Sequence, residues 1–260
     1  MIPNVGQFPE GQIIAFALIL LRIIAFVMSC PIFSAANVPL PVRILFSLVL
    51  GMVVFPTIHY QNIDLINLND QLIFLATREL FVGLALGFLM RMFFFAISIA
   101  GDLIGISMGL NAAQLFNPTL GSQSSVMENF ELALATMFFL AINGHHVFIS
   151  GLAQSFQILP ISAVAIKTQG FASMGQVAHE VVMMGIKIAS PVMVAIFLTN
   201  IAMGIIGRAV PQINVLVTSM PVTMLLGFVI MIVVTPLAVG EMTGMMNLMA
   251  ERFFQFMRVM

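Results

Sequence analysis

Long stretches of apolar residues constrain this chain more than any other feature. The stretch 213–239 contains no Asp, Glu, Lys or Arg, and the stretch 177–206 contains only two such residues. Because hydrocarbon offers the backbone no hydrogen-bonding partner, such stretches must form helices, and about 20 residues suffice to span a bilayer. Only 7% of the 260 residues are charged, whereas about a quarter are charged in a soluble domain. The sequence therefore predicts an all-α, multi-helix protein associated with a membrane.

Prolines and the Asn143-Gly144 pair divide the apolar stretches into separate helices. The last two long helices are joined by a tight turn at 207–212 and are predicted to form a helical hairpin. Between four and seven segments qualify as membrane spans, depending on how the short ones are counted. We expect helices at 12–33, 43–57, 72–100, 126–142, 145–159, 177–206 and 213–239, and then a short amphipathic tail at 241–260.

An irregular polar stretch at 101–125 separates two apolar blocks. Its glycines loosen the backbone, and Asn117-Pro118 is a turn signal. Such backbone is tolerated outside the bilayer, buried in protein, or lining a watery passage. Two interpretations remain open on these residues alone: a gate element in a protein-conducting pore, and an ordinary solvent-exposed loop.

Charged residues also occur inside the apolar segments. Each would cost about 2.5 kcal/mol or more at the bilayer centre, so these side chains are expected to face protein or a polar cavity. Oppositely charged members could pair, either within the chain or between subunits. Hydropathy therefore overstates how much of the chain touches lipid. The residues are Arg22, Arg78, Glu79, Arg91, Asp102, Glu128, Glu131 and Lys187.

The sequence offers no recognisable catalytic or metal-binding pattern. Cys30 is the only cysteine, which excludes an intramolecular disulfide and a cysteine metal cluster. His179-Glu180 begins like a metalloprotease helix motif, but Met183 stands where the second histidine ligand is required. A formal charge of -1 provides no basic surface for nucleic acid. We expect a protein that is not an enzyme and that uses no cofactor or metal.

Three stretches carry a resemblance to a known family. They are SMGLNAAQLFNPTLGSQSSVMENF at 107–130, FLAINGHHVFISGLAQSFQILP at 139–160, and the R-A-x-P-Q-x-N pattern that begins at Arg208. Together they resemble the FliR family of flagellar biosynthesis proteins, whose injectisome relatives are called SctT. The flagellar branch is the closer one.

The resemblance implies membership in the export gate of bacterial type III secretion. FliR-like proteins work in the bacterial inner membrane, at the flagellar basal body, with FliP, FliQ and FlhB, and with FlhA nearby. One FliR-type subunit combines with several FliP and FliQ subunits into a closed helical cone through which unfolded flagellar proteins are exported. The implied fold is a FliP-like part at 1–175 followed by a FliQ-like hairpin and tail at 176–260, within one integrated domain.

The resemblance also implies two sets of site residues. The loop after the third long helix plugs the pore in the closed state, and its residues here are Leu110, Asn111, Leu115, Phe116, Asn117, Pro118, Thr119, Leu120 and Gly121. The hairpin turn faces the cytoplasmic entrance near FlhB, through Arg208, Pro211, Gln212 and Asn214. An ordinary basic loop at the membrane face is the alternative for this turn.

A secondary transporter or small-solute channel is the competing function. Its binding site would be a broken helix around 101–125. Such proteins usually show repeated halves, and the sequence contains no internal repeat. They also work alone or as homo-oligomers, whereas an export-gate subunit co-purifies with other small membrane proteins.

Overall fold

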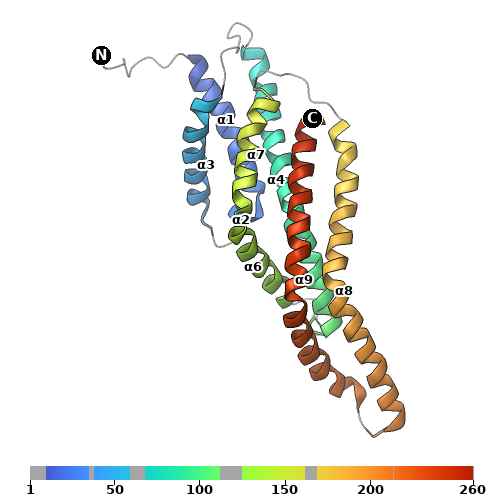
Figure 1. Ribbon diagram of the computed structural model, residues 1–260. Helices are drawn as coiled ribbons and strands as arrows, with labels where there is room; N and C mark the ends of the chain where they lie inside the picture. The colour runs from blue at the N-terminus through green and yellow to red at the C-terminus, as the bar shows by residue number, and fades with distance from the viewer. Residues whose placement is uncertain are drawn as a thin grey trace. The chain divides into compact units, whose positions relative to one another are not determined.

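A computed structural model describes residues 10–34, 38–58, 68–111, 125–161, 169–212 and 214–259. Within these ranges every regular element is a helix (Figure 1), which confirms the all-α prediction. The helices are α1 (Glu10–Ser29), α2 (Pro31–Ser34), α3 (Leu40–Val54), the short 3₁₀-helix η1 (Phe55–Thr57), α4 (Leu68–Met108), α6 (Val126–Ala141), α7 (Gly144–Ile158), α8 (Gln169–Ala209) and α9 (Val215–Val259).

Several of these helices are long and apolar enough to cross a membrane. In the described part of the chain, five meet both criteria by length and composition: Gly11–Ser29, Leu40–Thr57, Leu72–Met108, Gly175–Ala209 and Val217–Arg258. The helices α6 and α7 meet them only as a pair, which is bent by 69° at the Asn143 break. Asn143 has a φ of 57°, in the left-handed region that Asn tolerates better than most residues. The count agrees with the four to seven spans expected from the sequence.

Three predicted helix boundaries were wrong: α8 begins at Gln169 and not at 177, and two helices end later than expected. The helix expected at 72–100 continues to Met108, so Gly101 and Gly105 are helical and not part of a loop. The tail expected at 241–260 is the end of α9, which continues past Pro236 and through Gly240. A proline removes one backbone donor, but packing elsewhere along a long helix can offset that cost. At the ends of α4 and α9, tertiary contacts therefore outweighed the local tendency of glycine and proline to end a helix.

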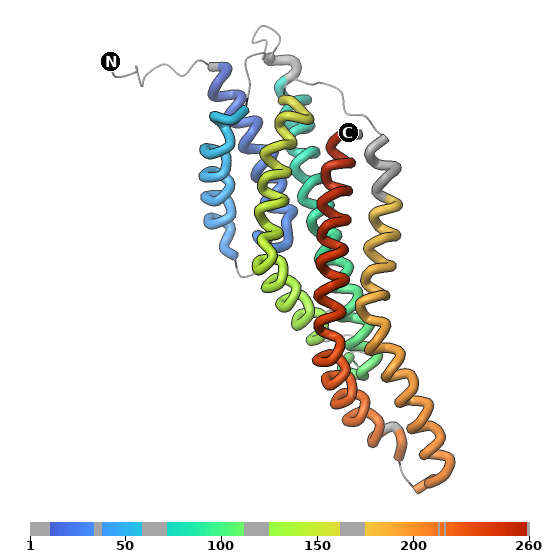
Figure 2. Tube along the Cα trace, in the orientation of Figure 1, coloured from blue at the N-terminus to red at the C-terminus, as the bar shows by residue number. Residues whose placement is uncertain are grey.

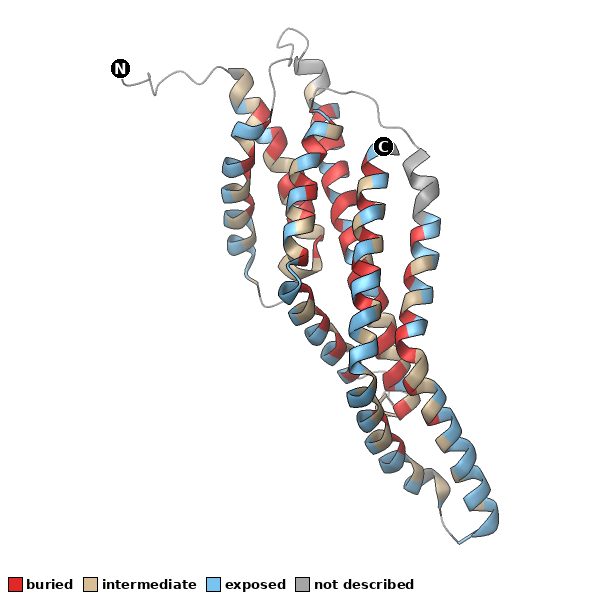
Figure 3. Ribbon diagram, viewed as in Figure 1, coloured by how far each residue is buried: buried red, intermediate tan, exposed pale blue. Residues whose placement is uncertain are grey.

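The first compact unit is drawn from three separate segments, Met1–Arg91, His145–Gly175 and Met249–Met260. Its core contains large side chains with almost no exposure. Figure 3 colours the ribbon red at buried residues. Phe148 of α7 meets Phe253 of α9 edge to face, with ring centroids 5.5 Å apart. A Cβ at Gly151 would lie only 2.6 Å from the Phe253 ring, so α7 and the end of α9 pack without a gap.

The second compact unit combines Met92–Gly144 with Gln176–Leu248. The helices α8 and α9 run antiparallel within it as a hairpin (Figure 2), and Lys187 of α8 pairs with Glu241 of α9 at 2.8 Å. Large apolar side chains on both helices are nevertheless exposed, including Phe197 at 63% and Ile232 at 74%. This unit therefore offers much apolar surface that its own residues do not cover.

One boundary between the units falls between Gly175 and Gln176, but the units alternate along the sequence and are not the two parts 1–175 and 176–260. That division concerns a likeness to FliP and FliQ, which the packing of this chain alone does not test, so it stays a prediction.

Candidate functional site

The predicted plug falls mostly outside the described residues. Leu115, Phe116, Asn117, Pro118, Thr119, Leu120 and Gly121 belong to the segment 112–124, which the structure does not describe. Leu110 and Asn111 are described, and both are half-buried beyond the end of α4. What the structure defines is therefore the root of this segment, where it leaves α4 and enters α6.

The first part of the root is a backbone contact between α4 and α6. A Cβ at Gly101 would lie 2.6 Å from the Glu128 Cα, and a Cβ at Gly105 would lie 2.6 Å from the Ser125 Oγ. Real Cβ atoms do not approach other atoms so closely, so only glycine permits this packing. The hydroxyl of Ser98 also donates a hydrogen bond to the Glu128 carboxylate. The glycines that suggested an irregular loop therefore serve as sites of close approach between helices.

The second part of the root joins the last turn of α4 to α9. The Thr223 Oγ1 donates a hydrogen bond to the Met108 carbonyl at 3.2 Å. A Cβ at Gly227 would lie 2.7 Å from the Met108 side chain, so α9 also lies directly against this turn. The end of α4 is thus held on two sides, by α6 and by α9.

The third part of the root joins the residues on either side of the segment 112–124. Gly109 adopts a φ of +79°, which favours glycine, and it turns the chain out of α4. The Leu110 amide donates to the Gly105 carbonyl at 3.0 Å. The Ser125 Oγ then donates to the Asn111 Oδ1 at 3.0 Å. The two ends of the segment 112–124 are therefore held together by a side-chain hydrogen bond.

The first compact unit contains a separate buried charge cluster. The guanidinium of Arg22 on α1 donates two hydrogen bonds to the Glu79 carboxylate on α4, at 2.5 Å and 2.9 Å. Arg22 and Glu79 are both 0% exposed. A bidentate pair of this kind has the geometry best able to offset the cost of burying two charges.

The helix α7 completes this cluster. Arg22 also donates to the Ser155 Oγ at 3.1 Å and to the Leu159 carbonyl at 2.9 Å, and its guanidinium lies 4.3 Å from the Phe156 ring centre. Arg78 donates to the Glu79 carboxylate at 3.2 Å and to the Pro160 carbonyl at 3.0 Å. The cluster therefore ties α1, α4 and α7 together by paired charges.

The other charges predicted inside apolar segments lie in different surroundings. Arg91 is exposed and Asp102 is half-buried. Lys187 is 60% exposed in its pair with Glu241. The structure thus brings together Arg22, Arg78 and Glu79 from the predicted set. Pairing between subunits stays a prediction.

The hairpin turn between α8 and α9 is an exposed feature. Arg208 in the last turn of α8 is exposed, and so are Pro211 and Gln212. The Asn214 Oδ1 accepts a hydrogen bond from the Val217 amide at 3.4 Å, so Asn214 caps the start of α9. Its carbonyl accepts a hydrogen bond from the Thr218 amide at 3.1 Å. A cationic group beside a well-formed helix start is therefore available to a partner.

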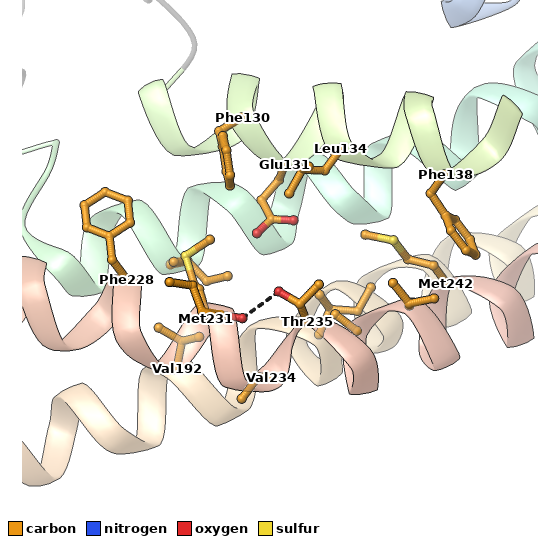
Figure 4. Close-up of a pocket in the computed structure, with 15 residues that line it drawn as sticks. Phe130, Glu131, Leu134, Phe138, Val192, Phe228, Met231, Val234, Thr235 and Met242 are labelled. Atoms are coloured by element: carbon orange, nitrogen blue, oxygen red, sulfur yellow. Dashed lines mark hydrogen bonds between the residues drawn. The ribbon is translucent and has the colours of Figure 1, made fainter. Parts of the chain in front are cut away.

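A pocket of about 480 Å³ lies within the second compact unit, between α4, α6, α8 and α9. Its lining is almost entirely apolar, and Glu131 of α6 directs its carboxylate into it (Figure 4). The only other polar side chain among the lining residues is Thr235, which donates to the Met231 carbonyl at 2.7 Å. The sequence marked Glu131 as a buried charge, but not the pocket around it, because the four helices come from distant stretches.

Sequence reasoning also missed the polar partners of the charge cluster. Ser155 and the Leu159 carbonyl belong to an otherwise ordinary apolar helix end, and nothing in their own stretch indicates an arginine partner. Thr223 and Gly227, which hold Met108, were likewise unmarked. The glycine spacing at 101 and 105, four residues apart on one helix face, was the available signal for close packing.

A sequence profile described as bacterial export proteins, family 1, matches residues 13–249. The match covers most of the chain. This chain belongs to that family.

Relatives of the export family extend over nearly the same length. The chain is 32% identical over 228 residues to the flagellar biosynthetic protein FliR of Bacillus subtilis, covering 84% of this chain and 85% of the relative. It is 28% identical to FliR of Escherichia coli over 84% of this chain and 83% of the relative. It is 29% identical to FliR of Aquifex aeolicus over 90% of each chain. The resemblance to the FliR family is therefore confirmed.

Proposed function

We propose that this chain is a subunit of the flagellar type III export gate in the bacterial inner membrane. In this proposal it forms a closed protein-conducting channel with FliP-type and FliQ-type subunits, and unfolded flagellar proteins pass through it. The observation that carries the proposal is the root of the segment 112–124. A gate needs a segment whose ends are held rigidly while its middle can change conformation, and the Asn111–Ser125 hydrogen bond closes such a base.

The composition of the segment suits a seal that must open. Leu115, Phe116 and Leu120 can exclude water and ions in the closed state. Gln and Ser side chains in the same segment allow an open state to be wetted. The plug residues proposed for the closed state are therefore those named from the sequence, with Leu110 and Asn111 at the base.

The exposed apolar surface of α8 and α9 supports membership in an assembly. Contiguous apolar patches on a folded protein mark sites that lipid or protein must cover. We assign the FliQ-like part to 176–260 and the FliP-like part to 1–175, with FlhB near the hairpin turn at Arg208 and FlhA in the vicinity. No enzymatic activity or cofactor belongs to this proposal.

Native mass spectrometry of the chain co-expressed with its operon neighbours tests the proposal. A hetero-oligomer with a single copy of this chain beside several FliP-type and FliQ-type subunits is the expected result. A stable monomer or homodimer would contradict it and favour a transporter, to be followed by solute-flux assays. Because α4 is helical through Gly101 and Gly105, a broken-helix site of such a transporter would have to lie after Met108.

A further inference from the structure

The pocket that contains Glu131 holds a carboxyl group that has no partner in the described part of the chain. Glu131 is 7% exposed, and its carboxylate has no hydrogen bond or ion pair with any residue that the structure describes. Figure 4 shows the carboxylate directed between α6 and α9, toward Met231 and Thr235. Thr235 already donates its hydroxyl hydrogen to the Met231 carbonyl. Lys187, a cation of the adjoining part of α8, is engaged by Glu241 at 2.8 Å.

A carboxylate in such surroundings is costly unless something complements it. Burial of a charge in apolar surroundings is tolerated when it is paired or hydrogen-bonded. The pocket supplies neither, although its volume of about 480 Å³ leaves room for an incoming side chain. A cationic group from outside these four helices would supply both the countercharge and the hydrogen bonds that the carboxylate lacks.

The exposed side chains at the rim of the pocket indicate which kind of molecule would bring the cationic group. Phe130 and Phe228 are each 46% exposed, and Ile232 is 74% exposed. Together they form an apolar surface around the pocket, which an apolar helix would cover. A lipid acyl chain could cover the same surface, but it would leave the carboxylate without a partner.

We propose that this pocket receives an apolar helix of a partner subunit and that a lysine or arginine of that helix pairs with Glu131. The proposal rests on the proposed function, because it requires that the chain works within a hetero-oligomer. It assigns to Glu131 a role in selecting the partner, since an apolar helix without a basic residue would leave the charge unpaired.

Photo-cross-linking within the intact assembly tests which molecule occupies the pocket. The photoreactive amino acid p-benzoylphenylalanine would replace Leu134, a pocket residue that is 39% exposed. The adduct is digested and its partner peptide is mapped by mass spectrometry. We expect a single apolar segment with a Lys or Arg within one helical turn of the cross-linked residue. Adducts with lipid alone, or with a segment that lacks a basic residue, would overturn the proposal.

Charge substitutions then test the pair itself. Glu131→Gln keeps the shape of the side chain, and Glu131→Lys reverses its charge. We expect recovery of the assembly to fall at least about tenfold in both variants, because an unpaired buried cation is left on the partner. An acidic substitution of the mapped basic residue should restore assembly of Glu131→Lys. Glu241→Gln, which breaks only the pair with Lys187, is the matched control and should assemble normally.

Two measurements separate the possible failures. The thermal unfolding midpoint of the isolated Glu131→Gln variant should not fall, because Glu131 has no partner among the described residues. Loss of assembly would then not be a folding defect. Normal recovery of Glu131→Gln assembly would overturn the inference while the export-gate function stands. If the wild-type chain forms no hetero-oligomer by native mass spectrometry, both proposals fail together.

Discussion

At the scale of residues, the buried cluster around Arg22 shows how this chain can carry charge inside an apolar body. Glu79 supplies one carboxylate to two guanidiniums, and the Ser155 Oγ and the carbonyls of Leu159 and Pro160 accept further hydrogen bonds. Removing the carboxylate would leave Arg22 and Arg78 buried without a countercharge.

Glu79→Gln is therefore expected to destabilise the chain strongly. The loss in free energy of unfolding should be about 3–5 kcal/mol, the usual result of breaking a buried pair. Unfolding in detergent, followed by circular dichroism, measures it. Lys187→Gln breaks an ion pair whose lysine is 60% exposed and should cost less than about 1 kcal/mol. Equal losses in free energy of unfolding for Glu79→Gln and Lys187→Gln would show that the cost of breaking these ion pairs does not depend on their burial.

Cys30 allows a second test at this scale. Its side chain is 0% exposed and lies beside the sulfur of Met90, at 3.1 Å. Burial raises the pKa of the Cys30 thiol from 9.0 to about 11. Only the thiolate reacts with maleimides, and this shift alone lowers its fraction at neutral pH about a hundredfold.

We therefore expect Cys30 in the folded chain to resist N-ethylmaleimide at neutral pH and to react fully after denaturation in dodecyl sulfate. Mass spectrometry of the intact chain measures the adduct. The control is a chain with Cys30→Ala and Ala209→Cys, because position 209 is exposed next to the hairpin turn. Rapid labelling of Cys30 in the folded chain would contradict its burial.

At the scale of elements, the contact of α4 with α6 depends on Gly101 having no Cβ atom. A methyl group at Gly101 would meet the backbone of Glu128, and backbone cannot move aside as a flexible side chain can. Gly204 of α8 has nothing within 4 Å of the corresponding position. The two glycines therefore form a matched pair for substitution.

Gly101→Ala should lower the free energy of unfolding by about 1–3 kcal/mol, the typical cost of overpacking. Gly204→Ala should be neutral or stabilise the helix by about 0.5–1 kcal/mol, because alanine favours helices over glycine. Thermal unfolding of the isolated chain compares the two. A stabilised Gly101→Ala variant would show that α4 and α6 do not pack at backbone distance.

The sequence predicted most elements because apolar periods and breakers are local signals. The Asn143-Gly144 break and the hairpin of α8 and α9 are examples. It misplaced the end of α4 because the same glycine can loosen a loop or admit a neighbouring helix, and only the packed structure distinguishes these cases. It likewise identified Arg22 and Glu79 as buried charges, but their pairing depends on contacts between residues 57 positions apart.

At the scale of the whole molecule, the segment 112–124 is expected to control leakage and not assembly. Its root is built from α4, α6 and α9, so changes within the segment leave those contacts intact. Replacing Leu115, Phe116 and Leu120 together by serine should therefore preserve the hetero-oligomer and raise ion leakage through it several-fold. Conductance in planar bilayers measures the leakage, and native mass spectrometry checks assembly.

Replacing Ser122 and Ser124 by alanine is the control, since it leaves the apolar side chains of the segment in place. An assembly that stays ion-tight after the triple serine replacement, and still exports protein, would contradict the proposed plug.

The length of α9 has a consequence for the cell. Its 45 residues correspond to roughly 67 Å of helix, more than twice the hydrocarbon thickness of about 30 Å. The end of α9 is covered by the first compact unit, but Leu225, Ile232 and Val233 are exposed earlier in the helix. A copy in which nothing covers that part would offer apolar surface to quality-control proteases. In the proposed hetero-oligomer, the synthesis of this chain would have to be matched to that of the other subunits, because quality control would have to remove every surplus copy.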